Sequence, residues 1–300
     1  MSKNILVIGS GAIASFYSAF LAKKTQITML CRSDYDVVKT NGIKIKSPIE
    51  NLHFYPQVIN NLNQYRHQAD YLIIATKALA QIDLIAMINQ LNYLPRNLVL
   101  IQNGIHIEKK LYENFPKINL ISVLAFVAVS RISSGIINHF DYGKLIIGNY
   151  PNKINQDCQQ LIDLFRDCNV EIEASENIVE ERWKKLIWNG AFNPVSVLGG
   201  GCDTKKLLDN PFCKDLLQKI MKEIIALARL DGFNLDDNLI DKNFELTYKM
   251  KPYKTSMLLD FEAKRPMEIE AILGNAISFA QSKSVTTPYL STLYALLSCY

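Results

Sequence analysis

The segment "RWKKLIWNGAFNP" (182–194) contains a row of polar side chains that could do chemistry. Lys185, Asn189 and Asn193 stand four residues apart, so on a helix they share one face and drift by only about 40° per step. An ammonium group can donate a proton, and amide groups can hold a substrate by hydrogen bonds. The same spacing also fits a solvent-exposed helix face, and periodicity alone does not decide between the two interpretations.

Pro194 lies at the end of this row and cannot donate to the carbonyl four residues back, which predicts a helix break near Asn193. A second group of polar residues, Ser256, Glu268 and Glu270, surrounds Pro266, which is expected in the first turn of the following helix. Carboxylates in a first helical turn interact favourably with the helix dipole. Capping is therefore the simpler explanation of the two glutamates when nothing else is known.

The turn "GSGAIA" (9–14) follows a short apolar run and opens a helical pattern. Gly9 permits the tight turn, Gly11 lets a pyrophosphate approach the backbone, and Ala14 is small enough for close helix-on-strand packing. The helix start adds free N–H groups and a partial positive charge. This context favours a dinucleotide site, with Ala12 and Ile13 among its residues, over an ordinary tight turn.

Arg32 follows the second expected strand, where an NAD site usually has Asp or Glu to accept from the ribose 2′-hydroxyl. A guanidinium cannot accept that hydrogen bond, but it can bind a 2′-phosphate through two N–H groups. The sequence therefore favours NADP over NAD. In the alternative interpretation, Arg32 is a solvated loop residue and Asp34 binds the ribose.

Lys77 in "IATKA" and Asn103 in "IQNG" come just past the ends of two further expected strands. In open α/β sheets such positions line the ligand crevice. Lys77 could therefore contact the cofactor phosphates or ribose, and Asn103 the nicotinamide or the substrate. Asn-Gly is also an ordinary turn pair, so turn chemistry explains either residue about as well when it is taken alone.

The elements that would position these residues change character along the chain. In the first half, strands expected at 3–9, 26–32, 69–77, 98–104 and 118–129 alternate with helical patterns at 12–24 and 78–91, and a further helix is expected at 156–169. This alternation predicts an α/β fold with a Rossmann-type, doubly wound parallel sheet. Helices are expected at 177–192, 210–232, 256–264 and 267–283. We expect an NADP-binding Rossmann domain over residues 1–174 and an all-helical substrate and catalytic domain over residues 175–300.

The composition fits a globular protein, and the cysteine pattern and apolar runs predict a cytoplasmic one. Hydrophobic residues make up 49% of the chain and charged residues 21%, which argues against a disordered chain. The net charge of +4 suits a small anionic ligand but is too weak to indicate nucleic-acid binding. The six cysteines form no C-x-x-C pair and no metal-like group with the four histidines, so we expect reduced thiols and no bound metal. No apolar run is long enough for a membrane span, and we expect no membrane partner.

Three motifs in this order resemble the ketopantoate reductase family. They are "ILVIGSGAIA" near the N-terminus, "RWKKLIWNGAFNPVSVLGG" in the middle and "TSMLLDFEAKRPMEIEAILG" near the C-terminus. The resemblance covers nearly the whole chain, and the two later motifs are much more specific than the glycine pattern. It implies an NADP-binding Rossmann domain followed by a helical domain.

The resemblance also implies roles for individual residues. Lys185 matches the catalytic lysine, and Glu268 the glutamate that acts beside it and holds the substrate. The implied substrate-binding residues are Asn103, Asn189, Asn193 and Ser256. The implied cofactor contacts, besides the glycine turn, are Arg32, Lys77 and Asn103.

The activity that the resemblance implies is the NADPH-dependent reduction of 2-dehydropantoate (ketopantoate) to (R)-pantoate, on the way to pantothenate and coenzyme A. Lys185 would be the general acid, with its pKa drawn toward neutrality by burial. A homodimer is possible. Ser10 in "GSG" and Glu270 depart from the commoner family pattern but remove no catalytic group. The alternatives are a reductase of the same fold for another 2-oxo acid and a non-catalytic NADP-binding regulator.

Overall fold

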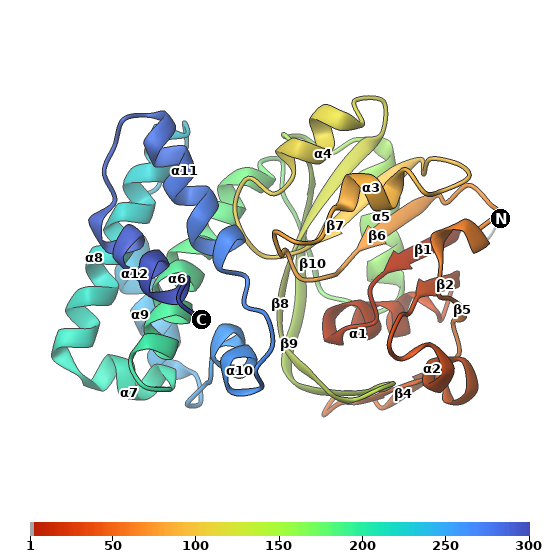
Figure 1. Ribbon diagram of the computed structural model, residues 1–300, viewed down its shortest axis with the longest axis horizontal. Helices are drawn as coiled ribbons and strands as arrows, with labels where there is room; N and C mark the ends of the chain where they lie inside the picture. Colours follow the sequence, from red (N-terminus) through yellow and green to blue (C-terminus); the bar gives the residue numbers. More distant parts are fainter. Residues whose placement is uncertain (1–2) are drawn as a thin grey trace. The chain divides into compact units, whose positions relative to one another are not determined.

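The computed structural model describes residues 3–300, and the chain forms two compact units (Figure 1). The first unit holds the chain up to Lys77 together with Asp83–Gln102 and Glu108–Ile178, and the second holds Ala78–Ile82, Asn103–Ile107 and Val179–Tyr300. In sequence, the last change of unit lies between Ile178 and Val179. Two short segments from the first half of the chain belong by their packing to the helical second unit.

A single mixed sheet forms the centre of the first unit. Its strands are β1 (Asn4–Ile8), β2 (Gln26–Leu30), β3 (Ile43–Lys46), β4 (Leu52–Phe54), β5 (Gln57–Ile59), β6 (Tyr71–Ile74), β7 (Asn97–Ile101), β8 (Asn119–Ser133), β9 (Ile136–Asn149) and β10 (Ile172–Ala174). The neighbours in the run β5-β2-β1-β6-β7-β8 are all parallel; the chain passes outward from β1 to β2 and β5 and then crosses back to β6 on the other side of β1. This confirms the predicted Rossmann-type α/β fold class.

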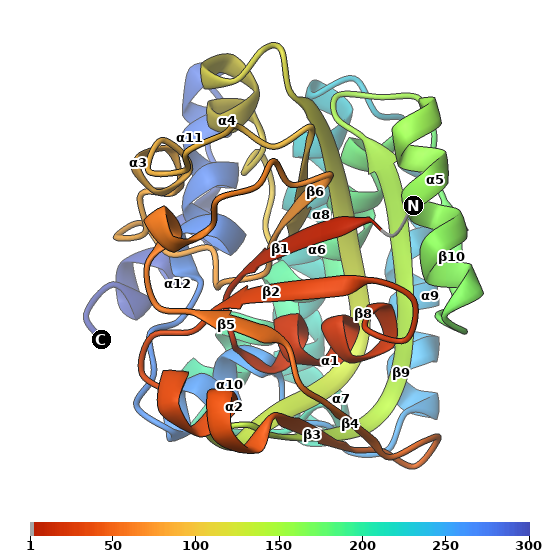
Figure 2. The ribbon, with the colours of Figure 1, turned by 90° about the vertical axis from the view of Figure 1, so that its right-hand side faces the viewer.

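Beyond β8 the sheet is no longer purely parallel. β8 and β9 form a long antiparallel pair, β3 and β10 each pair with β9 in parallel, and β4 closes that edge antiparallel to β3. Irregularities in the β8–β9 register bend the two long strands, which Figure 2 shows as curved ribbons. The sequence predicted β8 as a strand but gave no sign of this extension.

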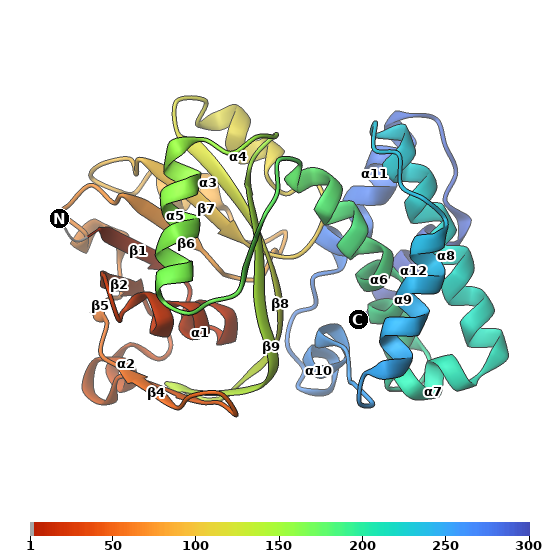
Figure 3. The same cartoon turned by 180° about the vertical axis from the view of Figure 1, so that it is seen from behind.

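Helices cover both faces of the sheet. They are α1 (Ala12–Leu21), α2 (Tyr35–Asn41), α3 (Leu84–Ile88), α4 (Lys109–Asn114) and α5 (Gln156–Asp167), with a short 3₁₀ turn η1 (Leu62–Gln64). Ile5 and Val7 of β1 join a hydrophobic cluster with α1 and α5, whereas Leu6 and Ile8 join a second cluster with α3 and α4. Figure 3 shows α5 lying across one face of the sheet. The continuous apolar run of β1 is therefore explained by burial on both faces.

The helix expected over 78–91 is much shorter than predicted. Only α3 is helical, and it begins where the Asp83 carboxylate accepts hydrogen bonds from the backbone N–H groups of Ile85 and Ala86. Capping by Asp83 fixes the start of the helix at that point. The preceding residues 78–82 do not belong to this unit at all.

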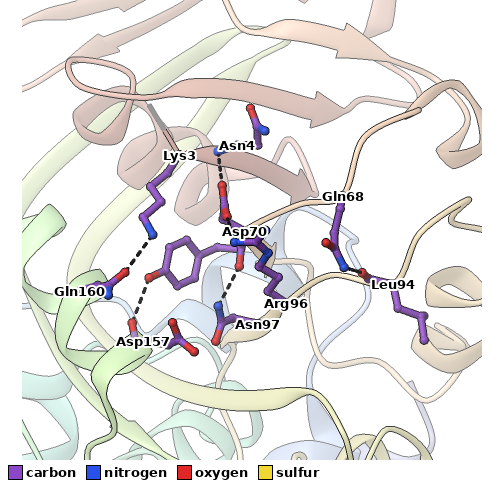
Figure 4. Close-up of polar contacts among 10 residues, drawn as sticks. Lys3, Asn4, Gln68, Asp70, Leu94, Arg96, Asn97, Asp157 and Gln160 are labelled. Carbon is purple, nitrogen blue, oxygen red and sulfur yellow. Dashed lines mark hydrogen bonds and ion pairs between the residues drawn. The ribbon is translucent and has the colours of Figure 1, made fainter. Parts of the chain in front are cut away.

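A polar network ties the amino ends of the central strands together (Figure 4). The carboxylate of Asp70 accepts a hydrogen bond from the backbone N–H of Asn4 at 2.8 Å and pairs with Arg96 at 3.3 Å. The side chain of Asn97 donates to the carbonyl of Asp70 at 2.9 Å. These bonds link the starts of β1, β6 and β7, at the edge of the sheet opposite to the glycine turn.

The second unit is helical. Its helices are α6 (Ile178–Leu198), α7 (Thr204–Asp209), α8 (Pro211–Leu230), α9 (Asn238–Lys249), α10 (Ser256–Glu262), α11 (Asn275–Ser282) and α12 (Pro288–Leu297), with a π-helical turn η2 (Glu270–Gly274) before α11. Helix α8 contacts α7, α9, α11 and α12. Helix α6 packs closely on α8, because Gly190 leaves room for the side chain of Ile224. Within residues 3–300, no helix has the length and apolar character required to cross a bilayer.

The predicted helix break near Asn193 is wrong. Helix α6 continues through Pro194 to Leu198. Both flanking turns are buried, including Phe192 and Val195. Because tertiary packing supplies most of the stability of such a helix, it outweighs the hydrogen bond that proline cannot make.

We expect Asp70→Ala to lower the free energy of unfolding by about 1–2 kcal/mol, because it removes the carboxylate that accepts from the backbone N–H of Asn4. Arg96→Ala is the matched control, since it removes only an exposed member of the same network and should change stability by less than about 1 kcal/mol. Urea denaturation of both variants measures the difference. Equal losses in the two variants would contradict a register-fixing role for Asp70.

Candidate active site

The residues expected to hold a cofactor lie at one edge of the first unit's sheet. The last residues of β1, β2 and β6 pair in register, so these strands end together. Gly9 follows β1 directly, while Arg32 and Lys77 come within three residues of the ends of β2 and β6. Arg32 is exposed and Lys77 is half-buried. Asp34, the alternative ribose ligand, is buried, and both of its carboxylate oxygens accept hydrogen bonds within the unit.

The glycine turn combines a positive φ with a helix start that no side chain caps. Gly9 has φ of +119°, and a Cβ at this position would come within 3.3 Å of the backbone after β6. Gly11 is the N-cap of α1, no side chain caps the helix there, and no atom lies within 4 Å of the place where its Cβ would stand. Ala12 and Ile13 form the first turn, which contains no acidic residue, and Ala14 is buried. The N–H groups of this helix start are therefore suited to an anion.

A row of three hydrogen-bonded side chains lies in the second unit. The Lys185 ammonium donates to Asn103 Oδ1 at 3.1 Å, and Asn103 Nδ2 donates to Glu268 Oε2 at 3.2 Å. The other oxygen of Glu268 accepts from the backbone N–H of Ala78 at 2.9 Å. Three residues singled out from separate parts of the sequence thus form one continuous network, which also fixes the side-chain amide of Asn103 in one orientation.

The environment of Lys185 lowers the pKa of its ammonium group. Burial of the ammonium group and the neighbouring guanidinium of Arg182 lower the pKa of Lys185 to about 7, against the opposing effect of Glu268. Its neighbour Lys184 behaves differently. Burial acts to lower the pKa of Lys184, but its hydrogen bonds to Glu180 and Glu181 outweigh burial and raise it. The sequence singled out Lys185 by its place in the polar row, and the structure adds the physical difference between the two lysines.

The loop that carries Asn103 is held firmly against the helices of the second unit. Gly104 has φ of +104°, and a Cβ there would stand 2.5 Å from the carbonyl oxygen of Ala271. The buried Arg182 donates to the carbonyl of Gly104 at 3.0 Å, and the backbone N–H of Ile105 donates to Ala271 at 3.1 Å. Glycine is therefore required in "IQNG" for close backbone approach as well as for a turn.

His106 adds an anchor that the sequence did not reveal. Its Nε2 atom lies 2.9 Å from Asp231 Oδ2, and the same oxygen accepts from Trp183 Nε1 at 2.8 Å. The His106 ring also makes edge contacts with Trp183 and Phe279. His106 and Asp231 are 125 positions apart, so no local pattern could have paired them. The cluster joins the Asn103 loop to the helix that carries Lys185.

Asn193 is the least satisfied polar residue of the α6 row. It is 1% exposed, and neither its Nδ2 nor its Oδ1 atom has a hydrogen-bond partner among residues 3–300. A buried amide left in this state costs about 1–3 kcal/mol per unpaired group. Asn189, one turn earlier, is half-buried. At Asn193 the polar face of α6 is therefore not exposed to solvent, which was one of the two interpretations that periodicity left open.

Ser256 stands at the first turn of α10 and is exposed. Its connection to α6 is indirect. Thr255 caps α10 by accepting from the N–H of Leu258, and its hydroxyl lies 2.7 Å from that of Ser196, which donates to the carbonyl of Asn193 at 2.8 Å. The structure thus ties the start of α10 to the Asn193 end of the row.

The first-turn position predicted for Pro266 is wrong. The chain is not helical at Pro266, and η2 begins only at Glu270. The carboxylate of Glu268 binds Ala78 and Asn103 instead of capping its own helix. Glu270 accepts from the Tyr294 hydroxyl at 2.8 Å. A π-helical turn beside these residues is typical of functional sites.

Two family models match most of the chain. Residues 5–152 match the model described as ketopantoate reductase PanE/ApbA, and residues 177–300 match the model of the ketopantoate reductase C-terminal domain. The chain belongs to the ketopantoate reductase family. It is thereby an oxidoreductase of this family, as the motifs predicted.

Individual ketopantoate reductases support the assignment over the full length. The chain is 31% identical to a 2-dehydropantoate 2-reductase of Nostoc sp., covering 96% of this chain and 92% of that protein. A crystal structure of 2-dehydropantoate 2-reductase from Methylococcus capsulatus superposes with a TM-score of 0.92 at 41% identity, covering 99% and 96% of the two chains. D-mandelate dehydrogenase, solved with NADH and anilino(oxo)acetate, shares the fold with a TM-score of 0.89 at 18% identity, covering 98% and 97%.

We expect Lys185 to react with an amine-directed acylating reagent with a half-maximal rate near pH 7, because its pKa is lowered to about 7. Lys184 is the internal control and should reach half-maximal reactivity only above the usual lysine range. Peptide mass spectrometry over a pH series measures both in one sample. A common midpoint for the two lysines would show that the environment of Lys185 has been misassigned.

Proposed function

We propose that this protein is a cytoplasmic NADPH-dependent 2-dehydropantoate 2-reductase, which forms (R)-pantoate for pantothenate and coenzyme A. The observation that carries the proposal is the Lys185–Asn103–Glu268 row, with an ammonium that titrates near neutrality, in a member of the ketopantoate reductase family. Such a group suits a reaction in which a ketone becomes an alcohol and must gain a proton.

The proposed cofactor residues are the glycine turn, Arg32 and Lys77. The turn and the start of α1 would hold the pyrophosphate, and the exposed guanidinium of Arg32 would bind a 2′-phosphate. Lys77, which follows β6 at the same edge, would add a second positive charge. Bound NADPH supplies the hydride for the ketone carbon.

Lys185 would supply the proton. As the carbonyl carbon is reduced, negative charge develops on its oxygen, and a nearby ammonium stabilises that charge before donating its proton. Asn103 holds the Lys185 amine in place through its side-chain oxygen and is itself held by Glu268. Glu268 also favours the protonated state of Lys185, against burial and Arg182. Together these groups keep a substantial fraction of Lys185 charged at neutral pH.

The residues that would bind the 2-oxo acid are Asn189, Asn193, Ser256 and Glu268. Asn193 has an amide that is buried without partners, so hydrogen bonds to a ligand would remove an existing energetic penalty. Asn189 and Ser256 would donate to the substrate carboxylate, and Glu268 would accept from the substrate hydroxyl. Retention of all these groups argues against a non-catalytic regulator.

Replacing Lys185 with Met should lower kcat by at least about 100-fold, the low end for loss of a positioned general acid, with little change in NADPH affinity. Stability provides the control against misfolding. The unfolded chain keeps the lysine proton up to about pH 10.5, whereas the folded chain releases it near pH 7. The charged lysine therefore opposes folding most below pH 7, and the stability of Lys185→Met relative to the native protein should be greater at pH 6.5 than at pH 10.

The matched control is Lys184→Ala, which should retain turnover because Lys184 is paired with Glu180 and Glu181. Steady-state kinetics and urea denaturation at the two pH values test these expectations. Near-normal turnover in Lys185→Met, or loss of turnover only in Lys184→Ala, would refute the assignment of the general acid.

Ketopantoate should be the best substrate in an NADPH-oxidation screen that also includes 2-oxoisovalerate and an aromatic 2-oxo acid, with NADH run in parallel. The expected result is the highest kcat/KM for ketopantoate with NADPH. Faster turnover of another 2-oxo acid would assign the chain to a reductase with a different substrate. Absence of turnover with every acid would favour a non-catalytic NADP-binding protein.

A further inference from the structure

Asp34 is a buried carboxylate that the proposed reaction does not use. It lies four positions after the end of β2, near the place where an NAD-type site has its ribose-binding acid. Its side chain is 2% exposed. A carboxylate is rarely buried so completely unless it is paired, so its partners decide what it can do.

Both oxygens of Asp34 are engaged by residues of the same unit. Ser10 Oγ donates to Oδ1 at 2.8 Å, and Arg131 donates through one guanidinium nitrogen to Oδ2 at 3.0 Å. Ser10 is the middle residue of the glycine turn, and Arg131 comes from β8, 97 positions away from Asp34. The adjacent Cys31 contributes no charge, because burial and the Asp34 carboxylate raise its pKa to about 12 against a hydrogen bond from Ser10.

This arrangement has two consequences for a nucleotide at the same edge. An Asp34 carboxylate that accepts from Ser10 and Arg131 and is closed off from solvent is not available to accept from a ribose 2′-hydroxyl. Its negative charge is also compensated by Arg131, so it does not repel a 2′-phosphate bound by the exposed Arg32. The first effect disfavours NADH, and the second favours NADPH. Ser10 departs from the commoner family pattern, and its hydroxyl is the group that donates to Asp34.

We propose that Ser10 and Arg131 determine cofactor specificity by holding Asp34 in a buried, neutralised state, so that the site selects a 2′-phosphorylated dinucleotide. The proposal rests on the proposed NADPH-dependent function and extends it to residues outside the glycine fingerprint. Stability alone is a weak explanation of the cluster, because an ion pair whose arginine is 39% exposed contributes little net stability. The cluster of Ser10, Asp34 and Arg131 instead connects the glycine turn, the end of β2 and β8.

The test is a double-mutant cycle on nucleotide binding, measured by fluorescence titration with NADPH and NADH in the absence of substrate. Arg131→Met leaves the Asp34 carboxylate without its cationic partner, which should reduce the NADPH-to-NADH affinity ratio by at least about 10-fold, since uncompensated like charge near the phosphate costs more than 1.4 kcal/mol. Asp34→Asn should retain the native ratio. The combined variant Asp34→Asn/Arg131→Met should recover a ratio within about 3-fold of the native protein, because the charge that needs compensation is gone.

The cycle separates this mechanism from direct recognition. If Arg131 bound the 2′-phosphate itself, the combined variant would be as defective as Arg131→Met, and the proposal would be overturned. An unchanged ratio in Arg131→Met would overturn it as well. Arg166→Met, which removes an exposed arginine of α5, controls for the loss of one positive charge and should leave the ratio unchanged.

A milder cycle covers the case in which Arg131→Met does not fold. Ser10→Ala keeps the ion pair but frees one oxygen of Asp34, and we expect the ratio to fall by about 3-fold, the effect of one lost neutral hydrogen bond. That fall should disappear in the Asp34→Asn background, and its persistence there would refute the proposal. The native protein reports separately on the proposed function, since equal affinity for NADPH and NADH in the native protein would remove the NADPH assignment itself.

Discussion

The proposed chemistry of the second unit depends on keeping one ammonium group partly buried without neutralising it completely. Burial and Arg182 lower the pKa of Lys185, and Glu268 limits that effect. Neither burial nor a nearby carboxylate alone would give a pKa near neutrality. A lysine paired strongly with carboxylates, such as Lys184, has a raised pKa, and a lysine that is buried without a carboxylate nearby would lose its proton. The balance requires a carboxylate near the ammonium group. Asn103 links the two groups, since it accepts from Lys185 and donates to Glu268.

That balance explains the unusual local structure around it. The Asn103 loop needs a glycine with positive φ so that its backbone can meet Ala271, and the chain near Glu268 continues into a π-helical turn. Asn193 stays buried without partners among the described residues. Each of these features costs stability, and such costs are usually retained where a site must be organised before its ligand arrives. The His106–Asp231 pair and the packing of α6 on α8 offset them by anchoring the loop and the helix.

In the first unit, partners from distant parts of the chain likewise hold a charged side chain, the carboxylate of Asp34. Asp34 is of a residue type that could accept from a ribose 2′-hydroxyl, yet it is buried and bound to Ser10 and Arg131. Its charge is therefore satisfied inside the protein. In both units a charged side chain is held by partners from distant parts of the chain, so that the protein controls which charge is presented to a ligand.

The sequence by itself determined the elements and the types of chemistry. The glycine turn needs small residues at fixed spacing, the strand of residues 4–8 needs a continuous apolar run, and the α6 motif carries its lysine and asparagines at helical spacing. These are local requirements, so they can be recognised locally. The break predicted at Pro194 was wrong because packing of both flanking turns, a property of the whole unit, outweighs one missing hydrogen bond.

Only the tertiary structure decided how these residues act on one another. Which of two adjacent lysines has the lowered pKa, and whether Asp34 can accept from a ribose, depend on partners up to about a hundred positions away. Electrostatic and hydrogen-bond energies depend on distance and burial in space, which spacing along the chain does not encode across such separations. The sequence therefore identified Lys185, Asn103 and Glu268 as separate candidates, and the fold joined them into one network.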